Sequence, residues 1–361
     1  MVHLVRCLCL WLVMQASMSA QEAALVKPSQ VLLPQTLLPL VHAYEVQDEL
    51  GLTDREVNDL EQVLRRLDGD WFRSRNLPPE GQWQEQDRLG VDFRKWSRAH
   101  WKPDRNRRLD QLELQAQGPR MLLRSDVAEE LNLSAEQTAT FAERAQATAS
   151  AQANLQEAVR RGEATESLEG LYSDAHRNER NGVASTLTDE QKKRLADRLG
   201  PTFDTSGLKR IYPLAPEFAA GTEWINSKPL TFESLKGRVV VVHFYAFQCQ
   251  NCQANFEVYR RWHQRYHDRN VVLIGIQSPE TALERDLEAV RQAAVDRQLE
   301  FPIVMDAEMK NWKNWANTMW PTVYVIDKRG YLRRWWQGEL NWQGATGDRE
   351  IEAAIETALA E

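Results

Sequence analysis

The chain has 361 residues, of which 42% are hydrophobic and 27% charged, and its formal net charge is -7. This balance is ordinary for a globular protein that folds in water, and the length allows more than one domain. The negative net charge argues against a general nucleic-acid binder, which would carry a basic surface.

Residues 1–20 have the composition of a secretory signal peptide. A weakly basic start is followed by a short apolar core, Leu8 to Met14, and by small residues suited to cleavage. The core is far shorter than the roughly 20 residues that span a bilayer. We therefore expect export to a bacterial periplasm or cell envelope, with an uncleaved N-terminal anchor as the alternative. Cleavage would remove Cys7 and Cys9 and leave only Cys249 and Cys252.

Residues 21–200 predict a helical domain of unknown role. Apolar residues from Leu50 to Leu67 recur at helical spacing. Further helices are expected over 88–117 with an interruption near Pro103, over 127–161 and over 168–199.

One short motif recurs in this region, at Leu50–Glu56, Leu131–Gln137 and Leu187–Gln191. In each copy, Ser or Thr is followed three residues later by Glu or Gln, which is the pattern of a helix capping box. The simplest interpretation is three well-capped helices. The motif also resembles the Leu-Thr-x-x-Gln pattern of CpxP/Spy-like periplasmic stress proteins, which implies a helical sensor or holdase-like module without catalysis.

Turn-forming residues close the helical region and place a linker at 201–215. From residue 216 to 361, expected strands alternate with helices, which argues for an α/β sheet. The expected strands are 239–246, 271–277, 301–305, 321–327 and 331–337, and the expected helices are 254–268, 280–298 and 348–360. The sequence thus predicts two domains, an N-terminal all-α domain and a C-terminal α/β domain.

The heptapeptide Phe247–Gln253 holds Cys249 and Cys252 at the predicted turn from a strand to a helix. Their spacing closes too short a loop to stabilise the fold, so the pair serves redox chemistry or binds a metal with help from elsewhere. Unpaired N–H groups at a helix start favour a thiolate. Cys249 is therefore the predicted nucleophile, and the more buried Cys252 is predicted to resolve the mixed disulfide.

Two metal chemistries fit poorly. Gln253 follows Cys252 where a haem-attachment motif requires His. His263 and His267 have the spacing of a zinc-protease motif, but Gln264 replaces the catalytic Glu.

The second half resembles the thioredoxin fold, because the cysteine pair follows the first long strand and Pro321 opens a later one. Ala215–Phe218 and Leu230–Gly237 are similar to the opening segment of TlpA/ResA-like exported thioredoxins. Trp315–Gly338 looks like the branch related to the C-terminal domain of DipZ. The resemblance covers about residues 215–345.

This resemblance implies a thiol–disulfide oxidoreductase without a bound cofactor. It also implies protein thiols and disulfides as substrates and a membrane electron donor such as a DsbD- or CcdA-like protein. Pro321 matches the family's cis-proline, which faces the dithiol and aligns the substrate chain. Trp320, Phe247 and Gln248 are expected at the substrate-facing surface, with plain core packing of Trp320 as an alternative.

Three positions depart from the usual thioredoxin pattern. Gln248 stands where Trp is common, and Gln250-Asn251 fill the space between the cysteines, so the direction of reaction stays open. His243 occupies a position that is often Asp in thioredoxins. A buried imidazole there predicts a proton relay to Cys252, with a hydrogen-bonded core histidine as the other interpretation. For the whole chain, the alternative function is an envelope adaptor or sensor with a regulatory dithiol.

Overall fold

The computed structural model describes residues 32–205, 208 and 213–361. The predicted signal peptide, with Cys7 and Cys9, lies outside these residues. Among the described helices, we find none that combines the length and the apolarity needed to cross a bilayer. The described residues divide into a helical unit, which comprises residues 32–37, 79–87 and 97–205, and a sheet unit, which comprises residues 38–78, 88–96, 208 and 213–361.

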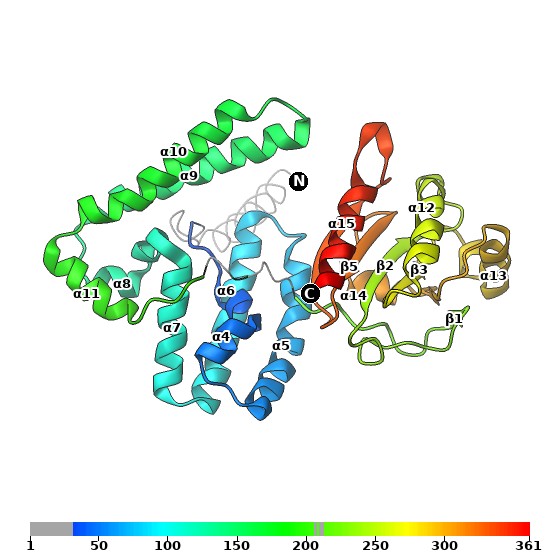
Figure 1. The fold of residues 1–361 in the computed structure, drawn as a ribbon, viewed down its shortest axis with the longest axis horizontal. Helices are drawn as coiled ribbons and strands as arrows, with labels where there is room; N and C mark the ends of the chain where they lie inside the picture. Colours follow the sequence, from blue (N-terminus) through cyan, green and yellow to red (C-terminus); the bar gives the residue numbers. More distant parts are fainter. Residues whose placement is uncertain (1–31, 206–207, 209–212) are drawn as a thin grey trace, which may run out of the picture. The chain divides into compact units, whose positions relative to one another are not determined.

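The helical unit confirms the expected helix content and the expected interruption at Pro103. Its core includes Leu114, Leu122, Phe141 and Leu187. Helices α9 and α10 run beside each other as a long hairpin (green in Figure 1). The described helices are α6 (Pro79–His100, shared with the sheet unit), α7 (Pro103–Gln117), η1 (Gly118–Leu123), α8 (Ser125–Glu130), α9 (Ala135–Arg161), α10 (Glu166–Thr186) and α11 (Asp189–Leu199).

The helices predicted over 127–161 and 168–199 are each divided in two, and the breaks coincide with two of the capping boxes. Ser134 accepts a hydrogen bond from the Gln137 amide at 3.1 Å, and Thr188 accepts one from the Gln191 amide at 3.3 Å. The third box, at Thr53, opens α5 (Asp54–Ser74). All three predicted capping boxes are confirmed. The resemblance to stress proteins remains a prediction.

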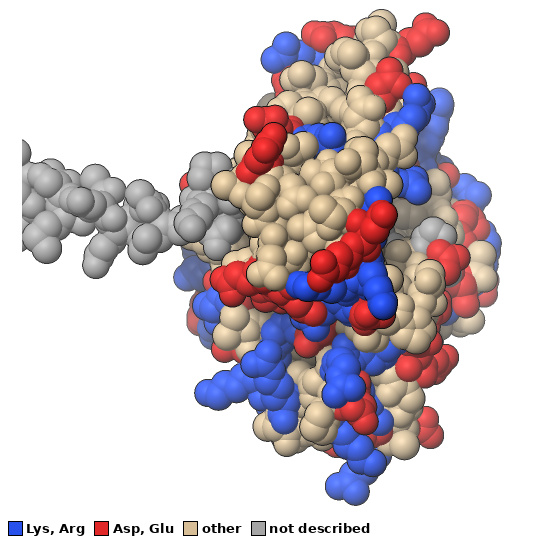
Figure 2. Space-filling model, turned by 90° about the vertical axis from the view of Figure 1, so that its left-hand side faces the viewer, with Lys and Arg blue, Asp and Glu red and all other residues tan. Residues whose placement is uncertain are grey.

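Acidic and basic side chains are interspersed on the face of the molecule shown in Figure 2. Ion pairs such as Arg124–Asp126 at 2.9 Å and Arg198–Glu130 at 3.2 Å join residues of the helical unit. Each pair joins a part-buried arginine to an exposed carboxylate, and ion pairs open to solvent contribute about 1 kcal/mol or less. Their main effect is to keep these helices solvated.

The sheet unit is built on a mixed sheet of six strands in the order β1-β4-β3-β2-β5-β6. Strands β2, β3 and β4 are parallel, and the other three pair antiparallel with their neighbours. The α/β class predicted for the second half is confirmed, although the short β1 was not predicted. The strands are β1 (Trp224–Ile225), β2 (Val239–Tyr245), β3 (Val271–Gln277), β4 (Ile303–Met305), β5 (Thr322–Ile326) and β6 (Leu332–Gln337).

Successive residues of a strand point to opposite faces of the sheet. Every residue of the apolar β2 is buried, so both faces of the sheet are covered at this strand. Val241 and Tyr245 face a core with α12 (Gln250–Tyr266), α13 (Leu287–Asp296) and α15 (Gly347–Ala360). Val242 and Phe244 face a second core that contains Trp315 and Tyr324. This core lies beside α14 (Lys310–Asn314), a helix that was not predicted.

The second core also takes in residues that the sequence assigned to the helical domain of 21–200. Helices α3 (Leu37–His42), α4 (Tyr44–Glu49) and α5 lie almost wholly in the sheet unit. Asp68 accepts hydrogen bonds from the His42 ring at 3.0 Å and from the Leu214 amide at 3.1 Å, and Phe72 packs edge-on against Trp315. Buried polar and aromatic contacts therefore attach the segment from α3 to α5 to the sheet unit, although the strands of the sheet come much later in the sequence.

Candidate active site

The two cysteines open helix α12 at the end of β2. Cys249 is the N-cap residue, and its sulfur accepts a hydrogen bond from the Cys252 amide at 3.3 Å. Both cysteines are free thiols, and the Cys252 thiol donates to the Cys249 sulfur over 2.6 Å. Cys249 is half-buried and Cys252 is fully buried. The predicted strand–turn–helix setting of the pair is present.

The surroundings of the two thiols shift their pKa values in opposite directions. The hydrogen bond from Cys252 is the largest influence on Cys249 and lowers its pKa, helped by backbone N–H groups at the helix start. Burial is the largest influence on Cys252 and raises its pKa. Cys249 is thus the thiol that ionises first, which is the property required of an attacking sulfur.

Pro321 lies at the same end of the sheet as the cysteines. Strand β5 is antiparallel to β2, and Thr322, the first residue of β5, pairs with Phe244 near the end of β2. The Trp320–Pro321 peptide bond is cis, as the resemblance implies for this position. Pro321 itself is buried.

Trp320 is part-buried and lies against the same apolar core as Cys249. Its indole N–H donates to the Ser278 carbonyl at 3.1 Å, and its ring packs at a tilt against Trp312 with centroids 4.0 Å apart. The side chain therefore combines core packing with a partly open face beside Pro321.

Phe247 and Gln248 form the turn before the nucleophile, and a residue that the sequence analysis missed holds this turn. Phe247 is buried, whereas the Gln248 side chain is exposed. The Gln248 amide donates to the Glu284 carboxylate at 2.7 Å, and the Thr281 hydroxyl donates to the Gln248 side-chain oxygen at 2.7 Å. Only one residue of this turn, Gln248, offers its side chain to solvent.

Glu284 is fully buried beside this turn, in the short helix η2 (Leu283–Arg285). Its carboxylate also accepts from the Glu280 amide at 2.8 Å and the Thr281 amide at 2.9 Å. Three backbone donors compensate for burying the charge. Nothing in the sequence marks Glu284, because its partners are backbone amides that carry no sequence signature.

His243 is fully buried on the face of the sheet that α12 covers. Its ring stacks on Tyr259 with centroids 4.0 Å apart and lies against Tyr245 and Phe301. Burial lowers the pKa of His243 to about 3, so the ring is neutral at physiological pH. Neither ring nitrogen has a hydrogen-bond partner in the described part of the chain, so the alternative of a hydrogen-bonded core histidine is not observed. The relay to Cys252 remains a prediction.

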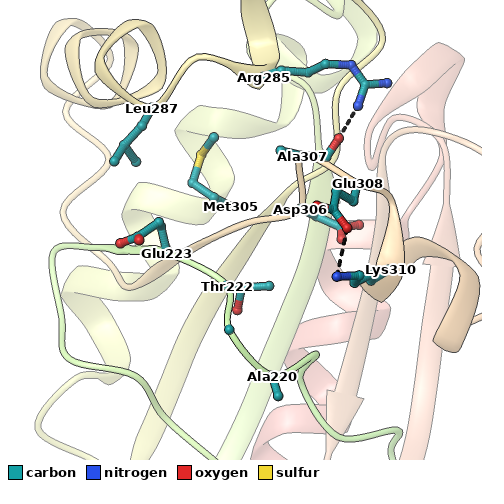
Figure 3. A pocket seen from close by; sticks show the side chains of 11 residues that line it. Ala220, Thr222, Glu223, Arg285, Leu287, Met305, Asp306, Ala307, Glu308 and Lys310 are labelled. Atoms are coloured by element: carbon teal, nitrogen blue, oxygen red, sulfur yellow. Dashed lines mark hydrogen bonds and ion pairs between the residues drawn. The ribbon is translucent and has the colours of Figure 1, made fainter.

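A separate hollow of about 180 Å³ lies at the end of β4 (Figure 3). Arg285 donates to the Ala307 carbonyl and Lys310 pairs with Glu308, so both basic side chains that line it are engaged with protein atoms. Asp306, which lines it, accepts from the Ser278 hydroxyl at 2.9 Å. Ser278 thus links the hollow to Trp320, because its hydroxyl bonds to Asp306 and its carbonyl accepts from the Trp320 indole.

Among residues 32–205, 208 and 213–361, we find no group of three His, Cys, Asp or Glu side chains placed to hold a metal ion. His263 lies on α12 and His267 is the C-cap residue of that helix, with ring centroids 6.1 Å apart.

Comparison with known proteins assigns residues 213–335 to the AhpC/TSA family. Protein DipZ of Mycobacterium tuberculosis (strain CDC 1551 / Oshkosh) is 34% identical over 132 residues, which are 35% of this chain and 19% of that protein. Protein SUPPRESSOR OF QUENCHING 1, chloroplastic, of Arabidopsis thaliana is 31% identical over 34% of this chain and 12% of its own length. Thiol-disulfide oxidoreductase YkuV of Bacillus subtilis (strain 168) is 24% identical over 40% of this chain and 94% of its own length.

The family match lies in the C-terminal part of the chain. The chain spans about a fifth of the length of DipZ and less of the plant protein. The predicted thioredoxin resemblance is confirmed for residues 213–335.

Proposed function

We propose, from the premise that residues 213–335 form a thioredoxin-like domain of the AhpC/TSA family, that this chain is an exported thiol–disulfide oxidoreductase. Its substrates are protein disulfides or thiols, and Cys249 and Cys252 carry the reaction. The observation that supports this most strongly is the cysteine pair itself. The N-cap thiol Cys249 is part-exposed and has a lowered pKa, and it accepts a hydrogen bond from the buried thiol Cys252.

The reaction with a substrate disulfide follows from the order of ionisation. The Cys249 thiolate attacks one substrate sulfur, forms a mixed disulfide and releases the other sulfur as a thiolate. The Cys252 thiol then gives up its proton, and its sulfur attacks Cys249. This step closes a Cys249–Cys252 disulfide and releases the second substrate thiolate. The substrate gains two electrons, which a membrane donor of the DsbD or CcdA kind restores to the enzyme as a dithiol.

The remaining site residues have roles in binding and proton transfer. Pro321 and Trp320 align the substrate chain beside Cys249, and Gln248 contributes an exposed side chain next to the nucleophile, whereas Phe247 supports the turn from the core. His243 is our candidate acceptor for the Cys252 proton, and this role requires a hydrogen bond that the reduced structure does not contain, since neither ring nitrogen has a partner among the described residues. A His243→Phe protein would then attack substrate at the normal rate but resolve the mixed disulfide slowly. Equal resolving rates in both proteins would exclude the relay.

Exchange with a model disulfide tests the function as a whole. The reduced protein is expected to exchange, and Cys249→Ser is expected to abolish the reaction; unchanged activity in that variant would refute the proposal. A Cys252→Ser protein should accumulate mixed disulfides with its substrates. An empty trap beside strong non-covalent partners would favour the envelope adaptor or sensor with a regulatory dithiol.

Two further measurements address direction and place. The equilibrium of the Cys249–Cys252 pair with glutathione gives its reduction potential, which separates a reductase from an oxidase. N-terminal sequencing of the exported protein tests the signal peptide, since a mature chain that retains Cys7 would contradict cleavage at the predicted site.

A further inference from the structure

Helix α14 ends in a conformation that its own sequence disfavours. The Asn317 amide donates to the Trp312 carbonyl at 2.9 Å and the Ala316 amide donates to the Lys313 carbonyl at 3.0 Å, which is the Schellman pattern of a helix end. Ala316 occupies the left-handed position of this motif, with φ at 44°. Glycine is usual there because a Cβ atom makes the left-handed conformation costly. Something else must therefore hold Ala316 in place.

The C-terminal end of α5 supplies the missing support. Arg75 donates from one nitrogen to the Trp315 carbonyl at 2.6 Å and to the Ala316 carbonyl at 3.0 Å. Asn76 donates to the same Ala316 carbonyl at 2.7 Å. A cation and an amide thus cap the carbonyls at the end of α14, where the helix dipole favours positive charge.

Arg75 is itself fixed in this position. Its guanidinium lies over the Phe72 ring at 3.6 Å from the centroid, and it donates to the Phe72 carbonyl at 2.7 Å. Phe72 belongs to the apolar core that also holds Trp315 and Tyr324. The Arg75 half of the cap is therefore anchored in the packed interior of the sheet unit, whereas Asn76 adds its bond from an exposed position.

The same contacts continue toward the cis-proline. Arg75 donates to the Tyr324 hydroxyl at 3.2 Å, which donates to the Asn317 side chain at 2.8 Å. Asn317 in turn donates to the Met319 carbonyl at 3.0 Å, directly before Trp320 and Pro321. An unbroken series of hydrogen bonds joins α5 to the segment that carries the cis-proline.

We propose that Arg75 and Asn76 are positioning residues of the redox site. They hold residues 315–319 in the conformation that sets Trp320 and Pro321 beside Cys249. The proposal rests on the proposed function for the meaning of that position, and it extends the working redox unit to α5, well before the family match begins at residue 213.

A kinetic comparison of two substrates tests this role in the full chain. A peptide disulfide needs alignment along Pro321, whereas a small aromatic disulfide needs only access to Cys249. Arg75→Met is expected to raise the KM for the peptide disulfide about tenfold, as loss of charge-assisted hydrogen bonds predicts. The rate with the small disulfide and the pKa of Cys249 should stay within about twofold and 0.3 units of the wild-type values.

Two companion variants make the test specific. Arg73→Met is the matched control, because Arg73 lies on the same helix, is exposed and pairs with Asp70. It should leave both substrates unaffected. Ala316→Gly should restore much of the peptide activity of Arg75→Met, since glycine adopts the left-handed conformation without support. This rescue would not follow if Arg75 merely stabilised the fold.

Equal loss with both substrates, wild-type kinetics in Arg75→Met, or no rescue by Ala316→Gly would each overturn the proposal. Hydrogen exchange of the Asn317 amide provides a readout without catalysis, and it should become faster in Arg75→Met and not in Arg73→Met. If the wild-type chain exchanged no disulfide, the proposed function would fail, while the amide measurement would still decide whether α5 holds the segment.

Discussion

Helices α11 and α12 begin with the same spacing of two capping side chains but with different atoms. In α11, the Thr188 hydroxyl accepts from the Gln191 amide, and the Gln191 side chain accepts from the Thr188 amide. In α12, the Cys249 sulfur accepts from the Cys252 amide, and the Cys252 thiol donates back to Cys249. Both arrangements satisfy donors that a helix start leaves unpaired.

The difference shows how one local geometry gives stability in one unit and reactivity in the other. A hydroxyl stays protonated at any physiological pH, so the hydrogen bonds at Thr188 contribute only to folding. An unperturbed thiol has a pKa of 9.0, which is close to neutrality. The same hydrogen bonds therefore change the ionisation of Cys249. Burial of Cys252 then separates the two thiols into an attacking and a resolving sulfur.

Exchanging sulfur for oxygen at the start of α12 should have the largest effect. Cys249→Ser is expected to lose disulfide exchange entirely while its free energy of unfolding changes by less than about 1 kcal/mol, because Ser is a good N-cap. Exchange assays and urea unfolding of the reduced protein measure the two properties. A large loss of stability would show that the sulfur cap is not equivalent to a hydroxyl cap.

Removing the buried donor should shift the titration of the nucleophile. In Cys252→Ala, the pKa of Cys249 is expected to rise toward 9.0, because the bond from Cys252 is the main cause of its depression. A lowered pKa means more thiolate at a given pH, so alkylation of Cys249 in the variant should need a higher pH than in the wild type. The thiolate absorbance against pH measures this shift. Coinciding titration curves would assign the depression to the helix start alone.

Glu284 tests whether the turn before Cys249 needs a buried charge. Glu284→Gln replaces an acceptor of three backbone N–H groups with an amide that also brings donors of its own, and it should lower stability by about 2–3 kcal/mol. Urea unfolding measures the change. Glu288→Gln is the control, because Glu288 is exposed and pairs with Arg291. Equal stability of the two variants would contradict this account.

The smallest effect is expected at Thr188, the N-cap residue of α11. Thr188→Ala should cost about 1 kcal/mol of stability in the helical unit and leave disulfide exchange unchanged. Thermal unfolding and the exchange assay check both statements. A fall in exchange would reveal that the two units depend on each other.

Local pattern was sufficient to predict the parts of the molecule that depend on neighbouring residues. The pattern correctly predicts the strand that precedes the Cys249–Cys252 turn, the helix that follows it and the three capping boxes, since each depends on residues a few positions apart. The single helices predicted over 127–161 and over 168–199 are wrong, because helical spacing on both sides of Ser134 and Thr188 hides the breaks at these two residues.

Contacts between distant residues could not be predicted in the same way. Arg75 reaches carbonyls some 240 positions away, and a backbone acceptor leaves no trace in the sequence of the donor. Glu284 is hidden for the same reason. The thioredoxin resemblance supplied Pro321 and Trp320, but it begins after α5 and therefore gave no hint that this helix completes the second core.

Gly275 limits which residues the buried site around His243 can accept. It pairs with His243 across β2 and β3, and a Cβ atom there would come within 3.1 Å of the imidazole and 2.9 Å of the Tyr245 ring. Replacing the imidazole with a shorter carboxylate relieves only the first of these contacts. We therefore expect a side chain at position 275 to destabilise the fold whichever residue occupies position 243, because the contacts with the Tyr245 and Phe301 rings remain.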